Sequence, residues 1–464
     1  MADRDPDQTS FGDARSPGVS TDDLLNNDTR TVPDFVKEDS WEYLGSEPLE
    51  AARYTDPAFF AQEKAKMWPA VWQMACRQEE LPEPGDTVVY ENVGKSWLLA
   101  RQEDGSVRAF ANVCLHRGRK LRTEGGPAKE FECPFHGFTW ATDGSLKRVP
   151  CQWDFPHLAD KDMSLPEARV AEWQGFIFIN EDGKAAPIEE YLHPLDEHFK
   201  RWRLDECYTA LWVGKVIHAN WKVVSEAFME AWHSVVTHPQ ILPFTADENS
   251  RYSLWGDNIN LTLTPFGVLS PHLYKEGHDE QFIVDSFARG SGRTAQSNEG
   301  MQIPEGHTAR TYIAELNRQQ FVEALGYDGS DLSDSEMVDA YTYNVFPNFS
   351  PWGGFAPNVV YRWRPWPDEG STLMEVRLLG RKPKDGPMPE AAEMRFLTED
   401  EPWDTVQEWG QLGHVFDQDM MNLPFVQQGL VSSANGLVEL GNYQESRIRQ
   451  FHRTMDKYLA RKDD

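Results

Sequence analysis

CLHRG (114–118) and CPFHGFTW (133–140) are the two segments that determine which fold this chain of 464 residues is expected to adopt. They pair Cys114 with His116 and Cys133 with His136, and sixteen residues separate the two pairs. Two thiolates and two imidazoles are the number and type of ligand that a soft or borderline metal centre takes. A lone buried Cys or His usually belongs to a core, but four in two tight pairs beside turn-forming glycines indicate a metal site.

The order of the ligands bears on the identity of the metal. Zinc accepts two cysteines and two histidines, but structural zinc sites usually pair Cys with Cys and His with His. Here each pair mixes the two types, which suits a cluster whose one iron takes both cysteines and whose other iron takes both histidines. Replacing two thiolates by neutral imidazoles raises the reduction potential of such a cluster. A zinc-stabilised binding module is the alternative, and such a protein would be colourless and free of iron.

The residues around these segments predict a small antiparallel β-domain. Asp-Gly pairs indicate tight turns between its strands, because both residue types tolerate positive φ. Four runs rich in β-branched and aromatic residues predict the strands themselves. These runs lie at 87–93, 96–102, 107–113 and 176–180.

After about residue 204 the chain mixes helices and strands. Together they predict an α+β fold, in which helices cover a second antiparallel sheet. The strand-like segments are 209–219, 259–269, 341–346, 358–365 and 372–380. The helical segments are 221–236, 402–430 and 443–461, and the segments 287–300 and 325–336, rich in Gly, Ser and Asp, predict loops.

The first of these helices carries a second group of candidate ligands. Glu226, Glu230 and His233 share one face of the predicted helix, which would be a solvated polar face in the simplest interpretation. Like charges at Glu226 and Glu230 repel each other unless something compensates them. His238 follows His233 by five residues, and the two lie roughly 140° apart on an ideal helix. They can meet only if the helix ends or kinks between them, which Pro239 favours.

A non-haem iron centre with two histidines also needs a carboxylate, and HVFDQDMMNLPFVQQGL (414–430) offers two candidates. Asp419 falls on the apolar stripe of this predicted helix and is expected to face the core. Asp417 lies about 200° away and is expected to face solvent. A buried carboxylate is costly without a partner, and a metal ion would provide one. The apolar members of the stripe are Leu412, Phe416, Leu423, Val426 and Leu430, and Pro424 must kink or restart the helix.

CLHRG and CPFHGFTW resemble the Rieske [2Fe–2S] motif of the α (catalytic) subunits of Rieske non-haem iron ring-hydroxylating oxygenases. The resemblance implies that Cys114 and Cys133 bind one iron of the cluster. It implies that His116 and His136 bind the other iron. In this family a catalytic domain with a mononuclear iron follows the Rieske domain.

NWKVVSEAFMEAWHSVVTHP (220–239) is similar to the family segment whose two histidines bind the catalytic Fe(II), which implies that His233 and His238 are ligands. The family places its ligand Asp eight residues before a Gln in an ending like V-Q-x-G-L. Asp419 precedes Gln427 by that interval, so Asp419 is the implied third ligand. Resemblance covers roughly residues 50–460.

Three residues before the first histidine, the family carries an acidic residue, most often Asp. It bridges a Rieske histidine of the neighbouring subunit to the iron-site histidine. Glu230 occupies this position, and the implied relay runs from His136 of one subunit to Glu230 and His233 of the next. Glu also occurs at this position in relatives that act on quaternary ammonium compounds.

The resemblance implies an oxygenase component that uses electrons from a Rieske cluster to activate O₂ at a mononuclear Fe(II). The expected substrate is an aromatic or other hydrophobic ring compound, which is hydroxylated or dihydroxylated. Oxidative O- or N-demethylation and oxygenation of a quaternary ammonium compound are the alternatives within the class. An electron carrier is the alternative from another class, and it would not need His233, His238 or Asp419.

The sequence carries no G-x-G-x-x-G after a strand, so the electrons are expected to come from a partner. By resemblance, this partner is a flavin-containing NAD(P)H reductase, which acts through a ferredoxin in some members. The relay between subunits implies an oligomer, by resemblance a homotrimer. Some members add a small β subunit.

The composition limits the partners and the location. The balance of 45 basic against 75 acidic residues gives a net charge of −30, which argues against nucleic acid and anionic membranes as partners. No apolar run reaches the roughly 18 residues of a membrane span, and the first residues lack the features of a secretory signal. Five cysteines are too few for a disulfide framework, and their number is odd. A cytoplasmic protein is therefore expected.

We expect three parts in the chain. Residues 1–40 hold ten acidic and four basic residues without apolar periodicity, which predicts a flexible acidic N-terminal tail. Residues 41–203 are expected to form the Rieske domain with its flanking segments. Residues 204–464 are expected to form the catalytic domain with the mononuclear iron.

Overall fold

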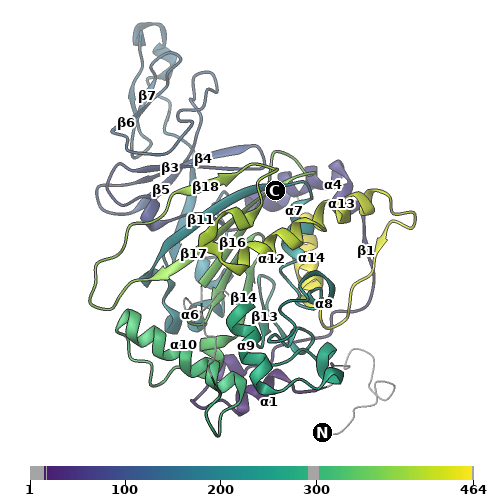
Figure 1. Cartoon of the computed structure of the whole chain (residues 1–464). Coiled ribbons are helices and arrows are strands. Elements are labelled where there is room, and N and C mark those ends of the chain that lie inside the picture. The colour runs from purple at the N-terminus through teal and green to yellow at the C-terminus, as the bar shows by residue number, and fades with distance from the viewer. Residues whose placement is uncertain (1–14, 17, 291–301, 357, 462–464) are drawn as a thin grey trace. The chain divides into compact units, whose positions relative to one another are not determined.

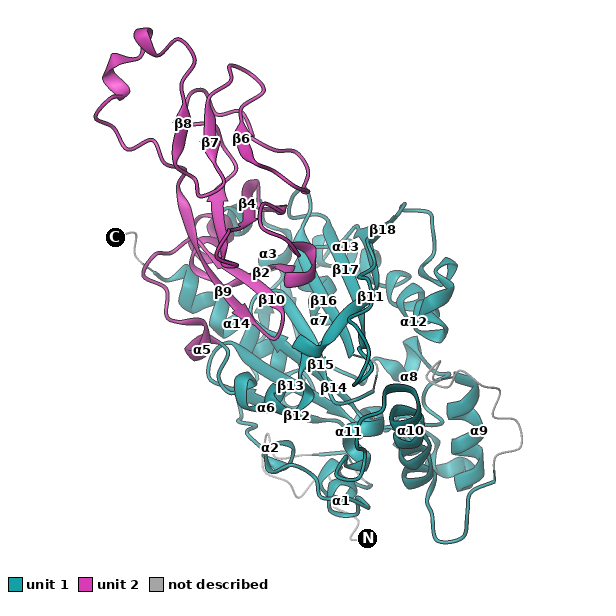
Figure 2. Ribbon diagram, turned by 90° about the vertical axis from the view of Figure 1, so that its left-hand side faces the viewer, with its two compact units in different colours: residues 1–61, 192–464 teal, residues 62–191 magenta. Residues whose placement is uncertain are grey.

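The computed structural model describes residues 15, 16, 18–290, 302–356 and 358–461, which divide into two compact units (Figures 1 and 2). Residues 62–191 form one unit, and the other described residues form the second. These boundaries differ from the expected ones at 41 and 203. The reason is that the chain before residue 62 packs with the residues after 191.

Residues 18–40 belong to the second unit and pack against the rest of it, whereas the sequence predicts a flexible tail. They contain the helices α1 (Thr21–Asn26) and α2 (Asp34–Lys37). Thr29 donates its backbone N–H to Asp334 at 2.7 Å, and Asp28 accepts the backbone N–H of Ser335 at 2.8 Å. The apolar side chains of Leu25, Val32 and Val36 are buried. These three contacts hold the segment in place although its apolar residues follow no helical or strand period. The rest of the predicted tail, residues 1–14 and 17, lies outside the described residues.

The unit of residues 62–191 is built on a six-stranded antiparallel sheet with the order β2-β10-β9-β5-β4-β3. The four strands predicted in this part are confirmed, whereas β2 and β9 have no counterpart among the predicted strands. The strands are β2 (Gln73–Arg77), β3 (Thr87–Asn92), β4 (Lys95–Arg101), β5 (Val107–Ala111), β9 (Glu167–Trp173) and β10 (Phe176–Asn180).

A smaller, three-stranded sheet completes this unit with β6 (Glu130–Glu132), β7 (Thr139–Ala141) and β8 (Leu146–Arg148). Its core contains Trp140, which is fully buried and donates its indole N–H to the carbonyl of Met163 at 2.8 Å. Helix α5 (Ile188–Tyr191) ends the unit. The small sheet holds one of the two loops with the predicted cluster ligands, so its packing fixes their position.

The second unit contains an eight-stranded sheet with the order β12-β13-β14-β15-β16-β17-β11-β18. All five predicted strands are present, although the sheet is not wholly antiparallel because β11 and β18 run parallel. The strands are β11 (Cys207–Ile217), β12 (Arg251–Trp255), β13 (Ile259–Thr264), β14 (Ala340–Val345), β15 (Phe349–Gly353), β16 (Asn358–Pro365), β17 (Thr372–Arg381) and β18 (Met394–Leu397). A separate pair joins β1 (Leu49–Glu50) to β19 (Leu437–Val438).

Helices cover this sheet, as expected for an α+β fold (Figure 1). Helix α7 (Trp221–Glu226) packs against β16 and β17, and Val223, Val359 and Phe416 lie in the core that forms there. The helices are α3 (Ala52–Thr55), α4 (Pro57–Gln62), α6 (Leu195–Trp202), α7 (Trp221–Glu226), α8 (Ser234–Thr237), α9 (Glu280–Gly290), α10 (Ala309–Leu325), α11 (Asp334–Val338), α12 (Gln411–Met420), α13 (Leu423–Val431) and α14 (Ser446–Leu459).

Two of the three predicted helical segments are interrupted. The segment 221–236 forms only α7 and the start of α8, and the segment 402–430 forms α12 and α13 after two short 3₁₀ turns. Neither predicted loop is free of helix: 325–336 contains the end of α10 and the start of α11, and residues 287–290 of the other loop end α9. Residues 291–300 lie outside the described residues. Both interruptions lie beside the second candidate metal site.

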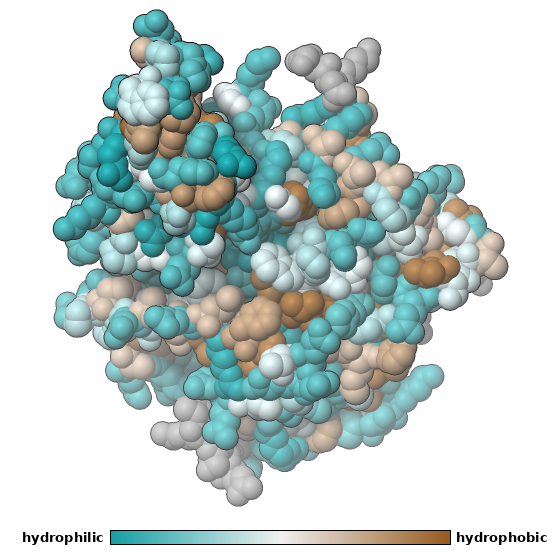
Figure 3. Space-filling view, turned by 90° about the horizontal axis from the view of Figure 1, so that it is seen from above, coloured by the Kyte–Doolittle hydropathy of each residue, from teal (hydrophilic) through white to brown (hydrophobic). Residues whose placement is uncertain are grey.

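Hydrophilic side chains cover most of the face shown in Figure 3, in keeping with the net charge of −30. Apolar residues appear there in separate groups. Of the helices in the described ranges, none has the length and apolar character required to cross a membrane.

Candidate metal sites

Two loops of the unit 62–191 present the predicted cluster ligands, one after β5 and one between β6 and β7. Both loops close in the same way. The backbone N–H of Gly118 donates to the carbonyl of Cys114, and that of Gly137 donates to the carbonyl of Cys133, each at 2.9 Å. Both glycines have positive φ, 80° and 76°, a conformation that other residues rarely adopt. The sequence therefore builds two similar tight loops, each headed by a cysteine.

The cysteines and the histidines of the two loops lie at different depths. Cys114 and Cys133 are buried, and the contact between their thiols adds to burial in raising the pKa of Cys114. The rings of His116 and His136 lie 4.7 Å apart between centroids, inclined by 69°. His136 is exposed. The thiols thus form the inner side of this site and the imidazoles its outer side.

The chemistry of these donors fits a two-iron cluster. Nδ1 of His116 is buried and has no hydrogen-bond partner among the described residues. Its ring stacks on Phe138 at 4.7 Å, which fixes the ring plane. Burial, with smaller contributions from His136 and Arg117, lowers the pKa of His116 and so favours the neutral imidazole. A buried nitrogen with an unused lone pair is costly unless it binds something, and a metal ligand of this kind accounts for it.

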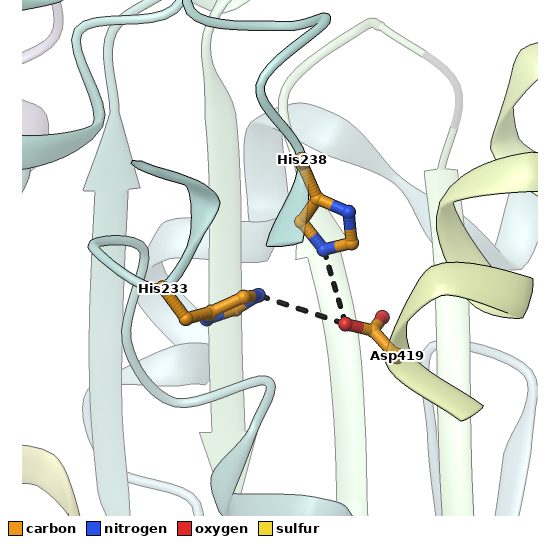
Figure 4. A group of neighbouring side chains, drawn as sticks. All are labelled: His233, His238 and Asp419. Carbon is orange, nitrogen blue, oxygen red and sulfur yellow. Dashed lines mark ion pairs between the residues drawn. The ribbon is translucent and has the colours of Figure 1, made fainter. Parts of the chain in front are cut away.

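The second unit brings together His233, His238 and Asp419 (Figure 4). One ligand atom from each lies within 4.8 Å of the other two. Nε2 of His238 is 3.0 Å and Nε2 of His233 is 3.7 Å from Oδ1 of Asp419. The side chains of His238 and Asp419 are 4% and 6% exposed, whereas that of His233 is 27% exposed. The three side chains thus enclose a point that is open on one side.

The break in the predicted helix is what allows the two histidines to converge. Helix α7 ends at Glu226, and α8 is a single turn with His233 at its N-cap and His238 at its C-cap. The ring centroids of the histidines are therefore 5.1 Å apart. A helix through residue 236 is wrong because the intervening backbone bonds to the sheet instead: Ala231 donates its N–H to the Tyr252 hydroxyl, and Met229 accepts a hydrogen bond from Thr262.

Helix α12 supplies more than Asp419. The adjacent side chain, Gln418, accepts a hydrogen bond from Nδ1 of His238 at 2.9 Å and another from Gln240 at 2.7 Å. Sequence reasoning missed Gln418, and its only signal is its place next to a candidate ligand. Asp417, which the sequence predicts to face solvent, is half-buried. Its carboxylate accepts the backbone N–H groups of Trp403 and Asp404, at 2.8 and 3.1 Å.

Glu230 contacts His233 twice. Its Oε1 lies 2.6 Å from Nδ1 of the ring, and its Oε2 accepts the backbone N–H at 3.1 Å. Burial by itself lowers the pKa of His233, but the carboxylates of Glu230 and then Asp419 outweigh it and raise that pKa to about 9. The site therefore favours positive charge at this imidazole, as a cation-binding site should.

Glu226 does not share the face of Glu230 and His233, contrary to the helical prediction. It ends α7 and points elsewhere, accepting a hydrogen bond from the Tyr54 hydroxyl at 3.0 Å. Its other oxygen lies 2.8 Å from Nε2 of His452. The repulsion expected between Glu226 and Glu230 is avoided because the helix stops between them.

A cavity of about 260 Å³ adjoins the three converging side chains and is lined by residues of the second unit only. His233, His238 and Asp419 form part of its wall. Most of the remaining wall is apolar, which is typical of a small-molecule site. Its aromatic residues include Phe228, Phe244, Phe266, Trp352, Tyr361 and Phe416.

Two known protein families match this chain, one over the segment with the Cys and His pairs and one over the segment with His233, His238 and Asp419. Residues 71–159 match the family described as the Rieske [2Fe-2S] domain. Residues 195–461 match the family described as the ring hydroxylating alpha subunit (catalytic domain). The chain therefore belongs to the ring-hydroxylating oxygenase α-subunit family, as the sequence motifs imply. The cofactors of this family are a Rieske [2Fe–2S] cluster and a mononuclear non-haem iron, so the zinc-module and electron-carrier alternatives lose their support.

Curated relatives act on different compounds. The carnitine monooxygenase oxygenase subunit of Acinetobacter baumannii is 32% identical over 40% of this chain and 51% of the relative. The large oxygenase component of the naphthalene 1,2-dioxygenase system of Pseudomonas putida is 34% identical over 50% of this chain and 53% of the relative. The chain spans about half the length of the curated relatives it matches.

Solved structures of similar fold come from the same two groups. A quaternary ammonium Rieske monooxygenase in complex with L-carnitine has a TM-score of 0.61 at 20% identity, covering 90% of this chain and 97% of that one. Naphthalene 1,2-dioxygenase with bound indole has a TM-score of 0.62 at 20% identity, covering 90% and 93%. At this identity the likeness shows the shared fold.

Proposed function

We propose that this protein is an oxygenase component that hydroxylates or dihydroxylates an aromatic or other hydrophobic ring compound with O₂. The observation that carries the proposal is the convergence of His233, His238 and Asp419 in the wall of an apolar cavity. Two imidazoles and one carboxylate are the ligand set of non-haem Fe(II) oxygenases. When bound, the Rieske cluster supplies single electrons and the Fe(II) activates O₂ beside the substrate.

The residues around the three proposed ligands orient them. Nδ1 of His233 faces Glu230, and Nδ1 of His238 faces Gln418. With the Nδ1 proton held by an oxygen acceptor, Nε2 of each ring keeps its lone pair for the metal. Both Nε2 atoms face Asp419, which completes the proposed ligand set.

The four Rieske-motif residues are the proposed cluster ligands. Cys114 and Cys133 would hold the inner iron, and His116 and His136 the outer one. The depths of the side chains support this assignment, because both thiols are buried and His136 is exposed. An iron held by the exposed His136 would be within reach of an electron-transfer partner.

Electron transfer is proposed to run between copies of this chain, from His136 of one to Glu230 and His233 of the next. Apolar side chains are exposed beside both ends of this path: Phe135 is 55% exposed, and Val236 is 82% exposed. Both side chains are therefore available for contact with a neighbouring copy of the chain. The assembly that closes such a path is a ring, and a homotrimer is proposed.

The electron donor is proposed to be a flavin-containing NAD(P)H reductase, with or without a ferredoxin. A small β subunit is a further candidate partner of the assembly. The proposed location is the cytoplasm. It is supported by the five cysteines, all within the described residues, which form no disulfide with one another.

A quaternary ammonium compound is the second candidate substrate. Two observations favour it: Glu230 stands where the family more often has Asp, and the carnitine monooxygenase subunit is among the relatives. The aromatic rings in the cavity could bind a cation through their faces. Uncharged ring compounds stay the first candidate because the cavity is largely apolar.

The test combines an iron assay with product analysis. Purified protein should contain about three iron atoms per chain and show the absorption of a Rieske cluster. Chemically reduced protein, exposed to O₂ and a panel of ring compounds, should yield hydroxylated products identified by mass spectrometry. About two irons per chain and no product from any compound would instead indicate an electron carrier.

A further inference from the structure

The wall of the cavity beside the proposed iron ligands contains a hydroxyl group that makes no hydrogen bond with the described residues. Tyr361 on β16 is only 2% exposed and lines the cavity. Its ring lies 4.8 Å from that of Phe228 and 6.1 Å from that of Phe416, so neighbouring rings hold it in place. No hydrogen bond among the described residues involves its hydroxyl. A tyrosine hydroxyl is protonated at neutral pH, so it can donate a hydrogen bond.

The charge of the cavity wall selects against one class of ligand. Its carboxylates are Glu230, Glu408 and Asp419, its imidazoles, His233 and His238, both lie at the metal end, and the described lining residues include no Lys or Arg. Glu230 contacts His233 and Asp419 contacts His238 at the end of the cavity with the proposed metal ligands, whereas Glu408 is exposed. A ligand carboxylate held away from the metal end would therefore be buried without a counter-charge from the described lining residues, which is strongly unfavourable.

The volume sets the size of the ligand. A cavity of about 150 Å³ suffices to bind benzene in another protein. This cavity, at about 260 Å³, therefore has room for a second ring or an equivalent substituent.

We infer that the cavity takes an uncharged, two-ring-sized compound with a hydrogen-bond acceptor that receives the Tyr361 hydroxyl, and that it disfavours carboxylates. This inference rests on the proposed function in one respect: the cavity is the substrate site of the oxygenase. It makes Tyr361 a residue that determines specificity. It also implies that the substrate specificity of this protein differs from that of an enzyme whose substrate carries a carboxylate.

The experiment uses three ligands with one carbon frame: indane, 1-indanone and indane-1-carboxylate. Binding to the iron-loaded protein is measured by calorimetry without reductant. We expect 1-indanone to bind about three- to tenfold more tightly than indane, the effect of one neutral hydrogen bond. We expect the carboxylate to bind at least about tenfold more weakly than the ketone. A carboxylate that binds as tightly as the ketone would overturn the inference, and this comparison needs no variant.

Tyr361→Phe removes only the hydroxyl, and we expect the preference for the ketone over indane to disappear. Tyr343→Phe is the matched control, because Tyr343 is also buried but donates or accepts at Nδ1 of His198 and does not line the cavity. It should keep the preference. A preference that survives in Tyr361→Phe rejects the role of this hydroxyl.

Oxygen uptake by the reduced protein is recorded separately with the same ligands. If the binding order holds but no ligand or other ring compound is oxidised, the proposed function fails and the binding inference stands. If ring compounds are oxidised but the binding order is reversed, only the inference fails.

Discussion

Glu230 Oε1 lies 2.6 Å from Nδ1 of His233, while Nε2 of the same ring faces Asp419 at 3.7 Å. One imidazole thus connects two carboxylates that have different tasks. Glu230 accepts a hydrogen bond from Nδ1 and fixes the orientation of the ring, and Asp419 lies where a metal ion could bind its carboxylate together with Nε2. This arrangement leads to the first two predictions.

Replacing Glu230 by Gln should slow electron arrival at the catalytic iron by about 10- to 100-fold, as with other residues that support a metal ligand. An amide keeps the shape of the side chain but loses the negative charge that faces His233. Stopped-flow reduction of the catalytic iron, followed with the Rieske absorption, measures the rate. Both metals should remain bound, and an unchanged rate would show that Glu230 is not on the path.

Asp419→Ala should abolish product formation and leave the cluster spectrum unchanged. The loss of the single proposed carboxylate ligand should reduce the iron content from about three to about two atoms per chain. Asp417→Ala is the matched control two residues away. It removes two hydrogen bonds to the backbone of residues 403 and 404, so it should lower stability by about 1 kcal/mol yet keep the iron. Full turnover by Asp419→Ala would move the ligand elsewhere.

Cys133→Ser should remove the Rieske cluster and its visible absorption, because the buried thiol is a proposed ligand. Cys151→Ser provides the control within the same unit, since Cys151 is exposed and belongs to neither loop. Its spectrum should match that of the parent. If the absorption persisted in Cys133→Ser, the ligand assignment would be wrong.

The stability of the second unit should fall in mild acid because of His198. Burial lowers the pKa of this histidine from 6.5 to about 4, so the folded protein keeps it neutral while the unfolded chain binds a proton. The contribution of His198 to the free energy of unfolding is therefore complete above pH 6.5. It is lost as the pH falls from 6.5 to 4, by about 3 kcal/mol in total. Denaturant unfolding at pH 7.5 and 4.5 measures it. His198→Gln cannot titrate and should lose less stability between these two values; an equal loss would contradict the assignment.

Residues that follow local patterns were predictable. The strands β3, β4, β5 and β10 coincide with runs of β-branched and aromatic residues, and the loops with the cysteines follow from the spacing of Cys, His and Gly. The α12 stripe also places Asp419 inward correctly. The phase changes afterwards, because α13 restarts at Leu423 with Pro424 in its first turn, and Val426 is 46% exposed.

The break after Glu226 could not be read from local patterns, because the apolar stripe continues past it. Helix α7 ends where the backbone of Met229 and Ala231 forms hydrogen bonds with Thr262 and Tyr252, which lie on strands distant in sequence. Gln418 and Tyr361 were missed for the same reason. Each acquires its significance from a partner or a cavity that only tertiary structure creates.

Gln418 and Asp419 are consecutive residues of α12, one bonded to His238 and the other facing both histidines. A small rotation and shift of that helix would move the Asp419 carboxylate away from both histidines. The same movement would break the hydrogen bond between Gln418 and the ring of His238. Metal binding and the stable packing of α12 should therefore depend on each other. The amide hydrogens of α12 should exchange more slowly when the metal is bound, so their exchange reports metal binding.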